Sequence, residues 1–230
     1  MDTIENRLQT VKDRIGKAAT DCGRDPHSIR LIAVSKTISA AIVQEAIQAG
    51  ASTLGENYVQ EARDKISILR DCEVSWHFIG HLQSNKAKYA VKLFDLIHSV
   101  DSVKLARELN KQALKSGKVQ QILIQVNISQ ESTKSGITVD ETSDLILEIS
   151  QYENLRIKGL MTMPPFFNQP ERVRPFFAAL RDLRDQISAK DIPGVCLDEL
   201  SMGMTGDFEV AIAEGATMVR VGTAIFGERI

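Results

Sequence analysis

The apolar positions of the chain follow two spacings, and their alternation predicts its secondary structure. Over residues 3–22 apolar side chains recur at every third or fourth position, which predicts an amphipathic helix; they are Ile4, Leu8, Val11, Ile15 and Ala18. Beyond this helix, short apolar runs with the length of buried strands alternate with segments of helical spacing. The pattern therefore predicts one helix followed by repeated strand–helix units.

The apolar runs provide eight strand candidates. They are Leu31–Ser35, Ser52–Leu54, Trp76–Ile79, Leu96–Val100, Gln121–Val126, Arg156–Met161, Val195–Leu200 and Thr217–Val221. The helical segments are Ala40–Ala49, Tyr58–Leu69, Asn85–Leu93, Val103–Leu114, Asp140–Ile149, Glu171–Ile187, Asp207–Ala213 and Ala224–Phe226. No linker rich in proline, glycine or serine separates these units, so we expect one α/β domain over residues 1–230. The expected fold is a (β/α)8 TIM-type barrel with an extra N-terminal helix, and a doubly wound parallel sheet is the alternative.

A lysine closes the first strand candidate, at the end where such barrels carry their active sites. Lys36 follows the apolar run and shares one side of the strand with Ile32 and Val34. Its amine can form a Schiff base with an aldehyde, although lysines that follow strands commonly reach into solvent instead. Two loops are expected on the same face of the barrel, at residues 127–137 and 164–170.

Arg220 lies in the last strand candidate, on the side shared by Met218 and Gly222. Barrel closure makes the first and last strands neighbours, so Arg220 and Lys36 are expected to reach one ligand. A buried arginine needs a partner. The carboxylate candidates are Glu56, Asp198 and Glu199. The alternative partner is the ring nitrogen of pyridoxal phosphate, which an arginine would leave unprotonated and a weaker electron sink.

Two segments near the C-terminus are rich in small residues and predict a phosphate site. In barrels of this type, phosphate binds between the loops that follow the last two strands, so we expect Ser201 and the backbone amides of Gly222 and Thr223 to form the cradle. A turn glycine is the alternative reading of Gly222. The helix that follows Thr205 is disfavoured, because Asp207 in its first turn would repel phosphate. An amine beside a phosphate cradle indicates pyridoxal 5'-phosphate as the cofactor.

Three further polar residues lie at or near the ends of strand candidates. Asn57 can contact a cofactor ring or cap the following helix. His77 and His81 straddle a strand end without a nearby carboxylate triad, so we predict no metal site and expect His77 to be a core histidine.

The composition of the chain argues against several classes of protein. The chain of 230 residues is 43% hydrophobic and 25% charged, with a formal charge of -2, which gives no basic excess for nucleic acid. Its three cysteines have no metal-ligand spacing and no disulfide framework. The acidic N-terminus lacks a signal-peptide core, and no apolar stretch reaches about 18 residues, so we expect a cytoplasmic protein outside the membrane. The low aromatic content, 5%, suggests no interface, and we expect a monomer.

Six ordered segments resemble the pyridoxal phosphate homeostasis protein family (the YggS family), whose fold is similar to the N-terminal barrel of alanine racemase. They are residues 33–37, 55–61, 77–86, 159–163, 201–205 and 220–227. The resemblance implies that Lys36 carries the cofactor as a Schiff base, that Arg220 faces the pyridine nitrogen, and that the phosphate is held by Ser201, Gly222 and Thr223.

The resemblance also implies a carrier or buffer of pyridoxal phosphate in intracellular vitamin B6 homeostasis, with apo pyridoxal phosphate-dependent enzymes as recipients. We expect no catalysis, because alanine racemase takes a second base from an added β domain and this chain ends directly after its eighth strand–helix unit. The alternatives are a pyridoxal phosphate-dependent amino-acid racemase of weak activity and a Schiff-base aldolase acting on a sugar phosphate.

Overall fold

The computed structural model describes residues 3–131 and 134–228, and within them eight parallel strands close into a barrel in sequence order. The strands are β1 (Arg30–Val34), β2 (Thr53–Glu56), β3 (Ser75–Phe78), β4 (Leu96–Val100), β5 (Gln120–Gln125), β6 (Leu155–Met161), β7 (Glu199–Met204) and β8 (Met218–Val221). Closure confirms the predicted TIM-type barrel and excludes the doubly wound sheet.

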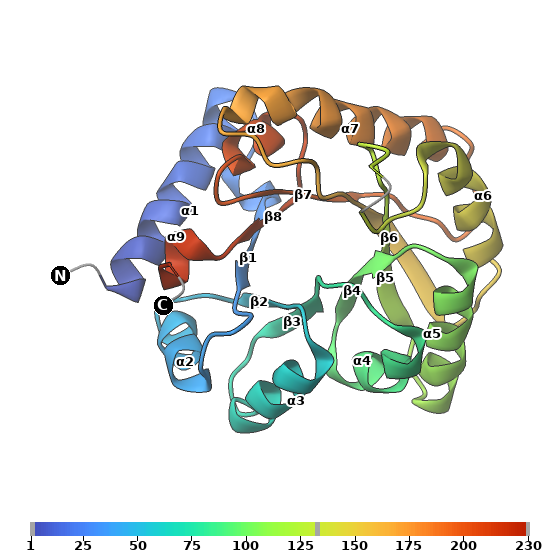
Figure 1. The fold of residues 1–230 in the computed structure, drawn as a ribbon, viewed down its shortest axis with the longest axis horizontal. Coiled ribbons are helices and arrows are strands. Elements are labelled where there is room, and N and C mark those ends of the chain that lie inside the picture. Colours follow the sequence, from blue (N-terminus) through green and yellow to red (C-terminus); the bar gives the residue numbers. More distant parts are fainter. Residues whose placement is uncertain (1–2, 132–133, 229–230) are drawn as a thin grey trace.

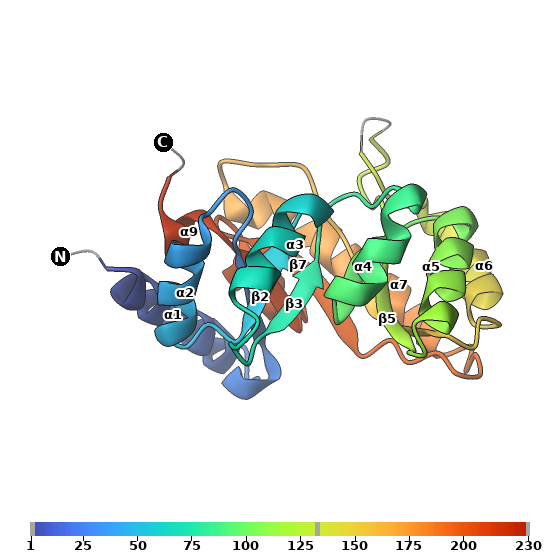
Figure 2. The same ribbon diagram turned by 90° about the horizontal axis from the view of Figure 1, so that it is seen from below.

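Helices surround the strands (Figure 1). They are α1 (Ile4–Asp21), α2 (Ala40–Gln48), α3 (Val59–Ile68), α4 (Ala87–Leu93), α5 (Val103–Lys115), α6 (Val139–Ile149), α7 (Arg174–Ser188), α8 (Phe208–Ala213) and α9 (Thr223–Phe226). Short 3-10 helices occupy η1 (Pro26–Ser28), η2 (Ser84–Lys86) and η3 (Pro170–Val173). The side view shows α2, α3, α4 and α5 following one another around the outside of the strands (Figure 2). None of the described helices combines the length and the apolar run that a membrane crossing requires.

The register of β1 places the two ends of the sequence side by side. Ile32 lies opposite Arg220 of β8, and Ala33 lies opposite Leu54 of β2. Because side chains alternate along a strand, this register puts Ile32 inside the barrel, where it packs in a small buried cluster. That cluster consists of Ile32, Leu96, Leu123, Met161 and Met218. The larger core lies between the strands and the helices.

The extra N-terminal helix is part of this larger core. α1 begins at an N-cap, where the Thr3 hydroxyl accepts a hydrogen bond from the Asn6 amide at 3.2 Å. Its side chains Leu8 and Val11 are buried in the main hydrophobic cluster. The helix packs on α8 and α9, so it covers the barrel where the first and last units meet.

The prediction for the seventh strand was wrong. We expected it at Val195–Leu200, but β7 begins at Glu199 and continues past Gly203. In the sequence, a glycine at this position is typical of a loop. Gly203 has a φ of 89°, and a Cβ there would lie 2.5 Å from the Cβ of Ala211 in α8. Glycine is therefore required here by the close packing of α8 on β7, not by a turn.

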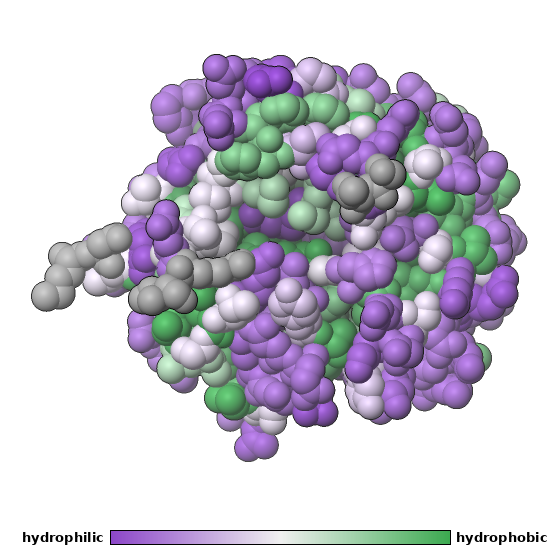
Figure 3. All heavy atoms as spheres, in the orientation of Figure 1, coloured by the Kyte–Doolittle hydropathy of each residue, from purple (hydrophilic) through white to green (hydrophobic). Residues whose placement is uncertain are grey.

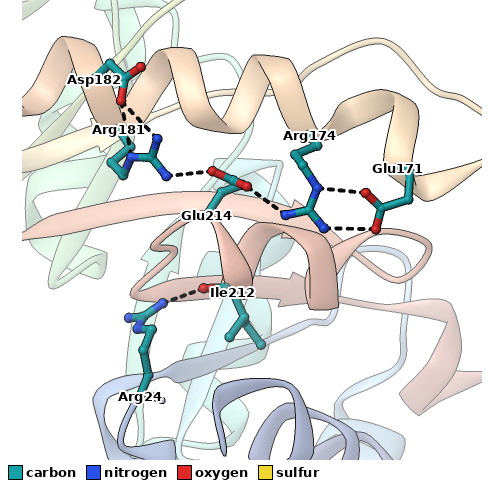
Figure 4. A network of polar contacts seen from close by, with 7 residues as sticks. All are labelled: Arg24, Glu171, Arg174, Arg181, Asp182, Ile212 and Glu214. Carbon is teal, nitrogen blue, oxygen red and sulfur yellow. Dashed lines mark hydrogen bonds and ion pairs between the residues drawn. The ribbon is translucent and has the colours of Figure 1, made fainter. Parts of the chain in front are cut away.

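A charged network fixes α8 against α7 (Figure 4). Glu214, the C-cap of α8, accepts a hydrogen bond from Arg174 at 2.7 Å and one from Arg181 at 2.6 Å, both in α7. Arg24 donates to the carbonyl oxygen of Ile212 at 2.8 Å. These contacts hold α8, which directly follows the loop after β7, in a defined position.

Candidate functional site

A cavity of about 280 Å³ opens beside the ends of β1, β2, β7 and β8. Of the predicted site residues, Lys36, Asn57, Arg220, Gly222 and Thr223 all line it. The loop after β6 adds an apolar wall made of Met163, Phe166 and Phe167. In the space-filling view, the face shown in Figure 1 is hollowed near its middle, with hydrophobic and hydrophilic residues around the hollow (Figure 3). The structure thus brings together residues that are far apart in the sequence.

A buried ion pair lies behind the strand end that carries Lys36. Glu56, at the end of β2, is fully buried, and its carboxylate lies 2.8 Å from the amine of Lys65, whose side chain is 7% exposed. The Ser35 hydroxyl donates to the same carboxylate oxygen at 2.6 Å. Burial raises the pKa of Glu56, and the hydrogen bonds from Lys65 and Ser35 oppose that rise. The pair therefore joins β1, β2 and α3.

Through Glu61, Lys65 is also linked to Thr37, the residue that follows Lys36. The Lys65 amine lies 2.6 Å from the carboxylate of Glu61, which accepts a hydrogen bond from the backbone amide of Thr37 at 2.5 Å. Thr37 has a φ of 64°, a left-handed conformation that is uncommon for a β-branched residue. Both chain neighbours of Lys36 are thus anchored to one network, which fixes the direction in which Lys36 leaves the strand. The sequence analysis missed Lys65, although its spacing of four from Glu61 on one helix was visible.

Arg220 is buried and donates two hydrogen bonds. One goes to the Ser201 hydroxyl at 2.6 Å and the other to the Thr162 carbonyl oxygen at 2.9 Å. Burial lowers the pKa of Arg220 to about 10, and the charge of Asp207 opposes this effect, so the guanidinium stays charged at neutral pH.

The carboxylates suggested as partners of Arg220 have other partners. Glu56 is paired with Lys65, and Glu199 lies 3.6 Å from Arg30. Asp198 accepts from the Cys196 thiol at 2.6 Å. No ion pair of Arg220 occurs among residues 3–131 and 134–228, so the salt bridge given as one alternative is not formed there.

Ser201 is the one predicted site residue that lies outside the described lining of the cavity. It is fully buried inside β7, outside the lining of the cavity, because the strand extends further along the chain than its apolar pattern predicted. Thr205, just beyond the strand end, lines the cavity instead, and its hydroxyl lies 3.3 Å from that of Thr223. Ser201 as a phosphate ligand therefore stays a prediction, and Thr205 is a further candidate that lines the cavity.

The sequence analysis expected Asp207 to repel phosphate from the helix that follows Thr205. The structure shows what this carboxylate contacts. The Asp207 carboxylate accepts a hydrogen bond from the Met204 amide at 2.6 Å. Burial raises the pKa of Asp207, which the Met204 hydrogen bond and the charge of Arg220 oppose. The carboxylate is thus occupied by its own loop, and it does not prevent Thr205 from lining the cavity.

Two features suit the cavity to a cofactor with a ring and a phosphate. The amide oxygen of Asn57 is buried and has no hydrogen-bond partner among the described residues. A Cβ on Gly222 would meet Val34 at an ordinary 3.5 Å, so packing within the protein does not require glycine there. Gly222 instead leaves room on the cavity side, where a phosphate can approach the backbone. These two features, together with the amine of Lys36 and the guanidinium of Arg220, fit pyridoxal phosphate.

Two histidines inside the barrel form a pair that the sequence analysis did not foresee. His77 is buried, as expected, but its Nδ1 lies 3.0 Å from Nε2 of His98 on β4, which is fully buried. Burial lowers the pKa of His77 to about 4 and that of His98 well below its usual value. His81 is exposed, and its contact is the Ser135 hydroxyl at 3.5 Å.

Comparison with known proteins assigns the family. Residues 2–230 match the family model described as alanine racemase, N-terminal domain. The chain is also 45% identical to the pyridoxal phosphate homeostasis protein of Aquifex aeolicus (strain VF5), over 97% of both chains. The chain belongs to the pyridoxal phosphate homeostasis protein family. The member from Escherichia coli (strain K12) is 44% identical over 100% of this chain and 98% of its own.

A solved structure of a similar protein supports the fold and contains a ligand. PipY of Synechococcus elongatus PCC7942, solved with PLP bound, matches with a TM-score of 0.86 and 37% identity, over 98% of this chain and 100% of PipY. An alanine racemase from Clostridium difficile 630 matches with a TM-score of 0.74 and 15% identity, over 100% of this chain and 57% of the racemase. At that identity the racemase shows the shared fold alone.

Proposed function

We propose that this protein binds pyridoxal 5'-phosphate as a Schiff base on Lys36 and buffers or carries it in vitamin B6 homeostasis. The observation that carries the proposal is the meeting of Lys36, Arg220 and the Gly222–Thr223 backbone in one cavity. The names of the relatives and the PLP-bound structure of PipY support it.

Each residue has a separate role in this proposal. The Lys36 amine condenses with the cofactor aldehyde, so that one carbon–nitrogen double bond forms and one water leaves. The hydroxyls of Thr205 and Thr223 and the amide of Gly222 hold the phosphate. Arg220 uses two of its five N–H groups on Ser201 and Thr162, and the remainder are available for the ring nitrogen.

A carrier fits the cavity better than a racemase does. Racemisation needs an acid or base on each side of the substrate carbon. Among the described lining residues, Asp207 is the one carboxylate beside the cations Lys36 and Arg220, and it is bonded to the Met204 amide. The lining contains no histidine, tyrosine or cysteine in the part of the chain that the structure describes. An arginine that only donates also leaves the ring nitrogen unprotonated, which weakens it as an electron sink.

The test compares Lys36→Ala with Lys86→Ala, an exposed lysine outside this cavity. Titration with pyridoxal phosphate should give the visible absorbance of a Schiff base in the wild type and in Lys86→Ala, and none in Lys36→Ala. A band of full intensity in folded Lys36→Ala would refute the role of Lys36.

The carrier role has its own test. Loaded protein should restore the activity of an apo pyridoxal phosphate-dependent enzyme, and it should leave a panel of single-enantiomer amino acids unchanged. Racemisation of one amino acid, abolished by Lys36→Ala, would support the weak racemase instead.

A further inference from the structure

A chain of four hydrogen-bonded side chains crosses the interior of the barrel beneath the cavity. The Arg220 guanidinium donates to the Ser201 hydroxyl at 2.6 Å, Ser201 Oγ lies 2.9 Å from Nδ1 of His98, and His98 Nε2 lies 3.0 Å from Nδ1 of His77. These residues are buried, with exposures of 4% or less, and come from β8, β7, β4 and β3. Arg220 alone of the four lines the cavity.

The chemistry of the four side chains determines which group donates in each of these hydrogen bonds. A guanidinium only donates, and each neutral histidine carries one N–H. If the Ser201 hydroxyl donates to His98 Nδ1, then His98 carries its hydrogen on Nε2 and donates to His77. The reverse order would leave the Ser201 hydroxyl hydrogen without an acceptor among the described residues, since its contacts are Arg220 and His98. The hydrogens therefore all point away from Arg220.

We propose that Ser201, His98 and His77 are positioning residues that hold the Arg220 cation in the place of a carboxylate. Every dipole in the ordered chain turns its negative end towards Arg220, and neighbouring hydrogen bonds polarise one another in a buried site. A carboxylate would neutralise the guanidinium. The uncharged side chains instead hold the guanidinium in position without neutralising it, so its positive charge can act on a hydrogen-bond acceptor in the cavity.

This inference rests on the proposed function in one respect, the identity of the acceptor. The chain makes Arg220 a donor with a fixed direction, so the group it meets must bring a lone pair. The unprotonated ring nitrogen of pyridoxal phosphate is such a group. The chain therefore sets the electronic state of the cofactor without touching it.

The decisive comparison is Ser201→Ala against Ser99→Ala. Both remove a buried hydroxyl inside the protein, but the Ser99 hydroxyl has no hydrogen-bond partner among the described residues, whereas Ser201 links Arg220 to His98. Pyridoxal phosphate should bind Ser201→Ala about tenfold more weakly, the loss expected for one hydrogen bond to a charged group. Its visible absorbance maximum should also shift, while Ser99→Ala keeps the wild-type affinity and maximum.

A second pair of variants, at His98, tests the proposal if Ser201→Ala fails to fold. His98→Asn keeps an amide near the position of Nδ1, and His98→Leu removes it at similar size. His98→Asn should retain more of the wild-type affinity and absorbance than His98→Leu. Equal affinities and spectra in Ser201→Ala and the wild type, or in the two His98 variants, would overturn the proposal.

A measurement without cofactor separates this inference from the proposed function. Nitrogen-15 NMR of the ring nitrogens should find His98 protonated on Nε2 at neutral pH, and a hydrogen on Nδ1 would overturn the ordered chain. If the wild type fails to bind pyridoxal phosphate, the proposed function fails, and the NMR result still decides the order of the hydrogens.

Discussion

At the scale of single residues, two lysines near the end of β1 lie in different places. Lys65 is buried between the carboxylates of Glu56 and Glu61. Lys36 lines a cavity whose described lining holds one carboxylate, that of Asp207. A nucleophilic amine must lose its proton before it attacks, and neighbouring carboxylates oppose this loss. The ion pairs with Lys65 thus take up both Glu56 and Glu61 beside the end of β1.

The buried histidines predict how stability depends on pH. Burial lowers the pKa of His77 from 6.5 to about 4, so between these values the unfolded chain binds more protons than the folded one. The free energy of unfolding should therefore fall by ~2 kcal/mol from this group as the pH drops from about 7 to about 5. Urea unfolding at several pH values should show a smaller fall in His77→Gln, and the wild-type fall in His81→Gln. An equal fall in both variants would contradict this assignment.

Some single-residue features of the site could be predicted from the sequence, and others could not. Alternation along strands placed Lys36 and Arg220 in one cavity, because parity and barrel closure depend on the sequence pattern alone. It could not reveal that His98 meets Ser201, since that contact joins side chains from strands on different parts of the barrel. Lys65 was missed for a related reason, because its burial depends on Ser35 and Glu56, which other elements supply.

At the scale of elements, the network around Lys65 ties β1, β2 and α3 together. Its amine contacts Glu56, Glu61 and the carbonyl oxygen of Ser35. The turn after β1 therefore depends on a side chain from a helix that follows the next strand. Loss of that side chain should loosen the cofactor site as well as the fold.

Lys65→Met should destabilise the protein by about 3–5 kcal/mol, because it leaves the Glu56 carboxylate buried without its partner. The matched control is Lys17→Met, which breaks another lysine–carboxylate pair of spacing four, with Asp21, at side-chain exposures of 75% and 60%. That exposed pair should contribute little. Urea unfolding compares them, and an equally small loss in both would show that the buried network does not stabilise the fold.

The element scale contains the main error of the sequence analysis. The other strands lie within a residue or two of their predicted bounds. The seventh was displaced because Gly203 and Ser201 look like a loop while α8 packs tightly on the strand. Because of that displacement, Ser201 lies inside the strand, and Thr205 lines the cavity beyond its end.

At the scale of the whole molecule, α1 joins the first and last units of the barrel. Leu8 is fully buried in the main core, so Leu8→Ala should lower the free energy of unfolding by about 2–5 kcal/mol. Leu114→Ala in α5, where the side chain is 64% exposed, should change it little. We expect one cooperative transition in both variants, measured by circular dichroism and tryptophan fluorescence. Two separated transitions would contradict a single domain over residues 1–230.

The central claim is that Lys36 holds pyridoxal phosphate, and borohydride trapping tests it most directly. Wild-type protein saturated with pyridoxal phosphate is reduced with borohydride, digested and mapped by mass spectrometry. The account predicts loss of the visible band on reduction and the pyridoxyl mass on the peptide that contains Lys36. A pyridoxyl mass on other lysines with Lys36 unmodified, or no adduct at saturating cofactor, would contradict it.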